Sequence, residues 1–197
     1  MVAPPRPDPL DRFVVVDGSG PLMVSVARLL RAEGVRSVQA GVWAADSTDA
    51  ELRRSAPAAA PDLVVLARSG RVDPRVGEPW RRRGIAHLPV TTSSARVVVG
   101  PWLTGNPEQP CLGCLALGFD QPAGVVSEAL VTTGAGMAAM VALAGLAGRA
   151  LPAGVSVEVH APWPRVDHRR WSRDLDCPLH EPALRGSPGQ AASTSVF

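Results

Sequence analysis

The sequence contains no lysine and no tyrosine, and all 20 of its basic residues are arginine. The absence of lysine excludes chemistry that depends on its amine, such as a P-loop phosphate site or a Schiff base. A net charge of +2 is too small to indicate a nucleic-acid-binding surface. The one dense basic cluster, WRRRG at residues 80–84, is typical of a solvated helix end, with an anion or partner contact as the alternative.

Long hydrophobic runs are also scarce. The best candidate for a membrane span, residues 125–147, holds Glu128 and two threonines among many alanines and glycines, which favours a buried helix of small residues. The first residues lack the apolar stretch of a secretory signal. We therefore expect a cytoplasmic protein that associates with neither membrane nor nucleic acid.

The length is that of one ordinary domain, which we place at residues 12–182. Proline-rich residues 1–11 and residues 183–197, rich in Ser, Gly, Pro and Ala, are predicted to be a disordered lead-in and a disordered tail.

Within the domain, residues 12–43 predict a strand, a glycine turn, a helix and a second strand. Val24, Ala27 and Leu30 mark the helical spacing, and Gly34 ends the helix. Further apolar runs alternate with helical stretches along the chain. We therefore expect an α/β fold of parallel strands joined by crossover helices.

Only three cysteines are present, and two form the pair Cys111 and Cys114 in PCLGC. Alone, such a pair is a redox motif, half of a metal site, or two small buried residues. The third cysteine, Cys177, stands three positions before His180 in CPLH. Three thiolates and one imidazole complete a tetrahedral zinc site with no open position. We predict a structural zinc site that ties this late turn to the start of the 125–147 helix.

The other histidines, His87, His160 and His168, show no spacing typical of a catalytic pair. We expect each to be structural or exposed.

Gly18 and Gly20 lie in VVVDGSGPL, between the first strand and the first helix, where a nucleotide phosphate would meet a helix N-terminus. Pro21 and Met23 stand where the full fingerprint needs a third glycine, and the next acidic residue after the second strand is Asp46. The glycines therefore indicate either a vestigial nucleotide turn or a turn required by backbone geometry alone, and we favour the second.

Two segments carry a family resemblance: VVVGPWLTGNPEQPCLGCLALGFD at residues 97–120 and RRWSRDLDCPLH at residues 169–180. They resemble the ThiF-type, ubiquitin-activating-enzyme-like superfamily, and within it the cyclodehydratase-associated, precursor leader-peptide-binding proteins of thiazole/oxazole-modified microcin (TOMM) biosynthesis. The resemblance covers about residues 12–182. His180 replaces the last cysteine of the family's closing Cys-Pro-x-Cys element.

The resemblance implies a Rossmann-like ThiF-type sheet with flanking helices and a structural zinc site. It also implies a catalytically inactive scaffold of ribosomal peptide modification, which helps present a precursor peptide to a partner cyclodehydratase or related enzyme. We expect the family's N-terminal winged-helix-like module to be absent. The incomplete glycine motif and the lack of lysine argue against ATP as a cofactor. Self-association is common in the superfamily, so the resemblance also allows a homo-oligomer.

Two alternatives stay open. One is a minimal ATP-dependent adenylyltransferase that activates a peptide carboxylate or amide. It would use Gly18 and Gly20 at the nucleotide turn, with Arg53 or Arg54 in place of the missing lysine. The other is a structural subunit whose 125–147 helix packs against a partner chain.

Overall fold

The computed structural model describes residues 10–54, 60–116 and 125–180. The predicted lead-in and tail fall almost entirely outside these residues. In chain order the elements are β1 (Phe13–Gly18), α1 (Gly20–Ala32), β2 (Ser37–Ala40), α2 (Val42–Arg54), β3 (Leu63–Ser69), the 3-10 turn η2 (Pro74–Gly77), α3 (Glu78–Arg82), β4 (His87–Thr92), β5 (Arg96–Val99), α4 (Leu112–Ala116), α5 (Glu128–Leu146), β6 (Val155–His160) and β7 (Arg165–Arg170).

The strands form one seven-stranded sheet in the order β2-β1-β3-β4-β5-β6-β7. The first four are parallel neighbours, as the alternation of strands and helices predicts. Because helices cover both faces, the central strands are apolar runs without alternation. Val14, Val15 and Val16 of β1 are all inaccessible to solvent.

The second half of the sheet differs from the expectation of parallel crossovers. β5 pairs antiparallel with β4, β6 with β5, and β7 with β6. Only residues 93–95 separate β4 from β5, and a connection this short can make a hairpin but not a crossover. The sheet is therefore mixed.

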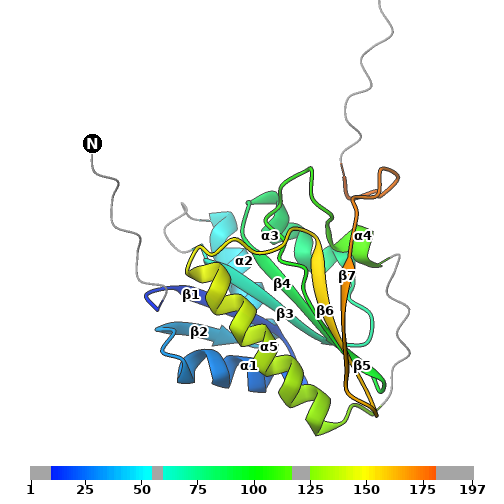
Figure 1. Ribbon diagram of the computed structural model, residues 1–197. Helices are drawn as coiled ribbons and strands as arrows, with labels where there is room; N and C mark the ends of the chain where they lie inside the picture. The colour runs from blue at the N-terminus through cyan, green and yellow to red at the C-terminus, as the bar shows by residue number, and fades with distance from the viewer. Residues whose placement is uncertain (1–9, 55–59, 117–124, 181–197) are drawn as a thin grey trace, which may run out of the picture.

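Helices cover the two faces of the sheet, with α1 and α5 in front and α2 and α3 behind (Figure 1). The α1 and α5 face holds the larger core, in which Val26 and Leu30 of α1 pack with strand valines and the alanines of α5. Val24, one of the residues that mark the helical spacing of α1, is 56% exposed, and Leu22 lies on the buried face instead. Burying a leucine such as Leu30 stabilises the fold by roughly 1.5–3 kcal/mol.

The small residues of α5 let it approach the sheet closely. A Cβ atom at Gly134 would lie 2.4 Å from Cγ2 of Val97, and one at Gly145 would lie 2.3 Å from the ring of Trp102. By length and hydropathy α5 could cross a membrane, but it packs on α1, β4 and β5. Its small-residue composition thus has a packing explanation.

Candidate metal centre

The structure brings together all four predicted metal ligands. Cys111 immediately precedes α4 and Cys114 lies within it, whereas Cys177 and His180 belong to the turn after β7. All four residues are buried, and their ligand atoms lie within 4.8 Å of one another. Figure 1 shows this turn close to α4. The cluster therefore joins the end of the described chain to the segment that follows β5.

The distances within the cluster fit a tetrahedral metal ion. Sγ of Cys111 lies 3.8 Å from Sγ of Cys114 and 3.6 Å from Sγ of Cys177. Sγ of Cys114 lies 3.2 Å from Nε2 of His180. A zinc ion with Zn–S bonds of about 2.3 Å and a Zn–N bond of about 2.0 Å separates two sulfurs by about 3.8 Å, and a sulfur from the nitrogen by about 3.5 Å. The three cysteines form no disulfide, so the cluster could bind a metal such as zinc.

The pKa values of two ligands determine which protons metal binding must displace. Burial raises the pKa of the Cys111 thiol to about 12; a hydrogen bond from the backbone of Cys114 opposes the rise, and the neighbouring thiols of Cys114 and Cys177 add to it. A thiol with this pKa becomes a thiolate at neutral pH only when a cation is bound. Burial, followed by the nearby Arg173 and Arg81, lowers the pKa of His180. Its imidazole is therefore held in the neutral form that binds metals.

Local backbone structure places the ligands. The amide of His180 donates to the carbonyl of Cys177 at 3.0 Å, which closes the CPLH turn. The amide of Asp174 donates to Sγ of Cys114 at 3.3 Å, and such N–H groups stabilise a thiolate from outside the ligand shell. A Cβ atom at Gly113 would lie 2.6 Å from Sγ of Cys177. Glycine at this position therefore permits the two turns to meet.

One part of the metal prediction is wrong. Cys111 and Cys114 do not lie at the start of the 125–147 helix, because they belong to the separate short helix α4, and α5 begins only at Glu128. The segment between the two helices lies outside the described residues. The cluster thus fixes α4, rather than the start of α5, to the turn after β7.

His87 lies beside the cluster, which the sequence did not predict. It is 1% exposed and, with Cys111 and His180, lines a cavity of about 10 Å³. Its Nδ1 lies 3.1 Å from the carbonyl oxygen of Ile85, and burial lowers its pKa. His87 is thus buried and held by the backbone. Of the other two histidines, His168 is exposed on β7 and His160 lies at the end of β6.

The glycine turn connects β1 to α1 as predicted. A Cβ atom at Gly18 would lie 2.1 Å from the carbonyl oxygen of Ala67 on β3, and Gly20 adopts a φ of +78°. Both glycines are therefore required by the backbone itself, whether or not a ligand binds there.

An ion pair occupies the sheet edge next to this turn. Strand order changes direction between β1 and β3, and ligands of open α/β sheets bind beyond the carboxyl ends of strands at such a point. Here Asp17, near the end of β1, accepts a 2.7 Å hydrogen bond from Nη2 of Arg68 on β3. Nη1 of Arg68 would lie 3.0 Å from a Cβ atom at Gly18. The guanidinium therefore lies against the glycine turn.

A cavity of about 320 Å³ adjoins this pair and is lined in part by Asp46 and Arg53. Arg53 forms an ion pair with Asp49, and Arg54 donates to the carbonyl of Ala50. Among the described residues, no hydrogen bond or ion pair joins either arginine to Gly18 or Gly20. The pair of Asp17 and Arg68 could have been suspected from the sequence, because both residues end apolar runs whose strands are predicted to be parallel neighbours.

Several solved structures share this architecture. A heterocyclase in complex with substrate and cofactor aligns over 88% of this chain and 26% of its own, with a TM-score of 0.66 and 14% identity. MccB of E. coli aligns over 86% of this chain and 65% of its own, with a TM-score of 0.63 and 10% identity. The chain has the MccB fold. The heterocyclase TruD shares it too, over 88% of this chain and 28% of its own, with a TM-score of 0.63 and 16% identity.

The ThiF-type fold expected from the sequence is thereby confirmed. No protein-family model and no curated protein matches the sequence. The chain spans about a quarter of the length of the two heterocyclases and 65% of MccB. MccB has been solved with ATP and with MccA.

Proposed function

We propose that this protein is a catalytically inactive, zinc-stabilised scaffold of ribosomal peptide modification. It works in the cytoplasm, where it helps present a precursor peptide to a partner cyclodehydratase or related enzyme. The observation that carries the proposal is the ion pair of Asp17 and Arg68, which occupies the strand ends where a sheet of this order would hold its ligand. The shared fold with MccB and the heterocyclases supports the pathway.

In this proposal the zinc ion is structural. Cys111, Cys114, Cys177 and His180 would hold it, and a set of four protein ligands leaves no position for a substrate or an activated water molecule. Zinc bound there would link α4 to the turn after β7, and its binding free energy would stabilise the folded chain. The protein's own residues contribute the neutral imidazole, the buried thiols and the N–H group of Asp174.

The scaffold role is tested by mixing the purified protein with the cyclodehydratase and the precursor peptide encoded nearest to it, followed by size-exclusion chromatography. We expect the three components to elute together and the yield of modified peptide to rise when the protein is added. A protein that elutes separately and leaves the yield unchanged would refute the scaffold role.

A second candidate function is a minimal ATP-dependent adenylyltransferase, which the cavity of about 320 Å³ beside the glycine turn favours. It predicts that the protein releases pyrophosphate from ATP and Mg²⁺ when a peptide acceptor is present. No pyrophosphate above the blank, under conditions in which the scaffold complex forms, eliminates this candidate.

A further inference from the structure

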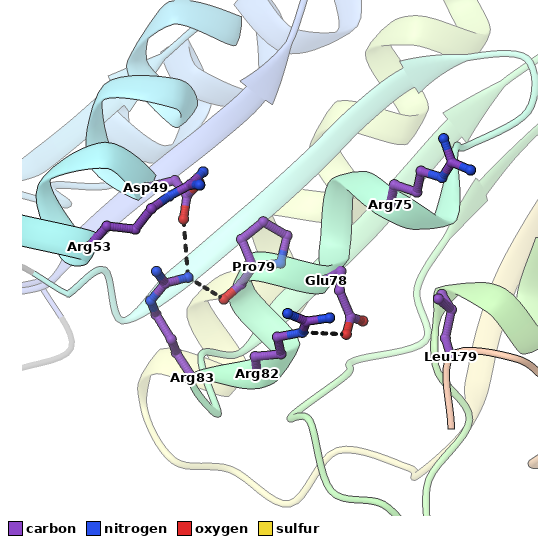
Figure 2. Close-up of a pocket in the computed structure, with 8 residues that line it drawn as sticks. All are labelled: Asp49, Arg53, Arg75, Glu78, Pro79, Arg82, Arg83 and Leu179. Atoms are coloured by element: carbon purple, nitrogen blue, oxygen red, sulfur yellow. Dashed lines mark hydrogen bonds and ion pairs between the residues drawn. The ribbon is translucent and has the colours of Figure 1, made fainter. Parts of the chain in front are cut away.

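An arginine-lined groove separates α2 from η2 and α3, on the face of the sheet that α2 and α3 cover. Its volume is about 620 Å³. In Figure 2 Asp49 and Arg53 on α2 lie across from Arg82 and Arg83, whereas the side chain of Arg75 points away from these four. The second wall contributes Arg75, Glu78, Arg82 and Arg83.

The two carboxylates of the groove are already shared between arginines. Asp49 pairs with Arg53 and, at 3.0 Å, with Arg83. Glu78 pairs at 2.8 Å with Arg82 and at 2.8 Å with Arg81. The arginines in the groove therefore outnumber its carboxylates, and a guanidinium has five N–H donors, more than one shared carboxylate can accept.

Three of these guanidiniums are accessible to a ligand. The side chains of Arg53 and Arg82 are 68% and 73% exposed. Arg75 is also exposed, and it forms no ion pair with the residues that the structure describes. They belong to three different elements, so their charges are distributed along the groove rather than gathered at one point.

This distribution favours separate carboxylates over a compact polyphosphate. Arg53 and Arg82 stand in the last turns of α2 and α3, where the carbonyl ends of the helices disfavour any anion, and a multiply charged phosphate more than a single carboxylate. Phosphates instead gather at helix N-termini. In an extended peptide, alternate side chains on one face are about 7 Å apart, so acidic residues there can reach guanidiniums on different elements.

We propose that this groove binds an acidic peptide segment, whose carboxylates contact Arg53, Arg75 and Arg82. The inference rests on the proposed scaffold function and deepens it, because it assigns the surface that holds the peptide. Leu179 forms part of the groove and lies between two of the proposed zinc ligands, Cys177 and His180. A zinc ion bound at this centre would therefore position one of the residues that line the peptide site.

The test uses fluorescence anisotropy with a fluorescein-labelled hexaglutamate peptide and the zinc-loaded full chain. We expect saturable binding that weakens with added salt, and no binding of labelled hexaglutamine. The double variant Arg75→Gln/Arg82→Gln should weaken binding by about fivefold, which corresponds to about 1 kcal/mol, or about half of that from each of two exposed ion pairs. A thermal melt verifies that the variant is folded.

The matched control is the double variant Arg28→Gln/Arg149→Gln, which removes two exposed arginines on α1 and after α5, away from the groove. Its affinity should stay within about twofold of the original. The proposal is overturned if both double variants weaken binding equally, or if hexaglutamate does not bind. It is also overturned if tripolyphosphate displaces the labelled peptide at a lower concentration than unlabelled hexaglutamate does.

The experiments can refute the scaffold function and the peptide-binding role of the groove independently. A three-component complex that forms although hexaglutamate does not bind would overturn the groove and leave the scaffold role intact. Binding of hexaglutamate with the expected dependence on Arg75 and Arg82, without any complex with the partner enzyme, would support the groove and contradict the scaffold role.

Discussion

Sγ of Cys114 lies 3.2 Å from Nε2 of His180, although 66 positions separate the two residues in the sequence. The contact closes a cluster of four buried ligand atoms between α4 and the turn after β7. Three thiols and an imidazole at these distances could hold one metal ion between them.

Loss of His180 should release the metal. We expect His180→Ala to bind zinc more than about tenfold more weakly and to melt at a lower temperature, because zinc binding to the folded chain adds to its stability. The control is His168→Ala, since His168 is exposed on β7. Zinc content by elemental mass spectrometry and thermal melting provide the readouts. Equal zinc content in both variants would contradict the assignment of His180.

Zinc binding should release protons at neutral pH. Burial raises the pKa of Cys111 to about 12, so its thiol is protonated in the metal-free protein and must lose that proton to bind zinc. We expect an indicator dye to report acidification when zinc is added to metal-free protein at pH 7.5, and the apparent zinc affinity to fall as the pH falls. Proton release that is unchanged in Cys111→Ser would show that Cys111 is not a ligand.

A methyl group at position 113 should disturb the centre. In Gly113→Ala the new Cβ atom would lie 2.6 Å from Sγ of Cys177 and 3.1 Å from Cδ1 of Leu179. We expect weaker zinc binding and a lower Tm. Gly136→Ala is the matched control, since a Cβ atom on this helical glycine meets nothing within 4 Å and should stabilise α5 by up to about 1 kcal/mol. The account fails here if both variants retain zinc equally well.

Stability should depend on pH through Glu78. Hydrogen bonds from Arg81, and then Arg82, lower the pKa of Glu78 below its ordinary value of 4.5. A lowered pKa contributes stability that is present above pH 4.5 and is lost as the pH falls through the folded-state pKa. We expect Glu78→Gln to cost roughly 1 kcal/mol at pH 7, and the difference to shrink below pH 4.5.

Urea unfolding at several pH values measures this difference. Glu51→Gln is the control, because Glu51 is exposed on α2 and forms no ion pair within the described part of the chain. The prediction is wrong if the stability difference between the original protein and Glu78→Gln is the same at pH 7 and at pH 3.

The cluster of three cysteines and one histidine and the first half of the sheet could be predicted because their signals are local. Two ligands on each of two tight turns have a fixed spacing, and an apolar strand followed by a glycine turn and an amphipathic helix has a definite order. The strand β7 had no such signal. Its sequence RVDHRR has one apolar residue, Val166, which is 58% exposed at the edge of the sheet.

The relationships on which the functional proposals rest were harder to predict because they join distant segments. The hydrogen bond between Asp17 and Arg68 depends on the pairing of β1 with β3, and it lies where a nucleotide turn was the open alternative. The arginine-lined groove depends likewise on how α2 faces α3. The WRRRG cluster indicated an anion contact only as an alternative. Its sequence alone could not show that Asp49 and Arg53 lie across the groove from Arg82 and Arg83.

The most direct test of the zinc-stabilised, ATP-independent scaffold is native mass spectrometry of the purified protein, recorded alone, with a chelator, and with ATP and Mg²⁺. We predict one zinc ion per chain, loss of that mass with the chelator, and no ATP adduct. A protein without zinc, or one that carries one ATP per chain, would contradict the account.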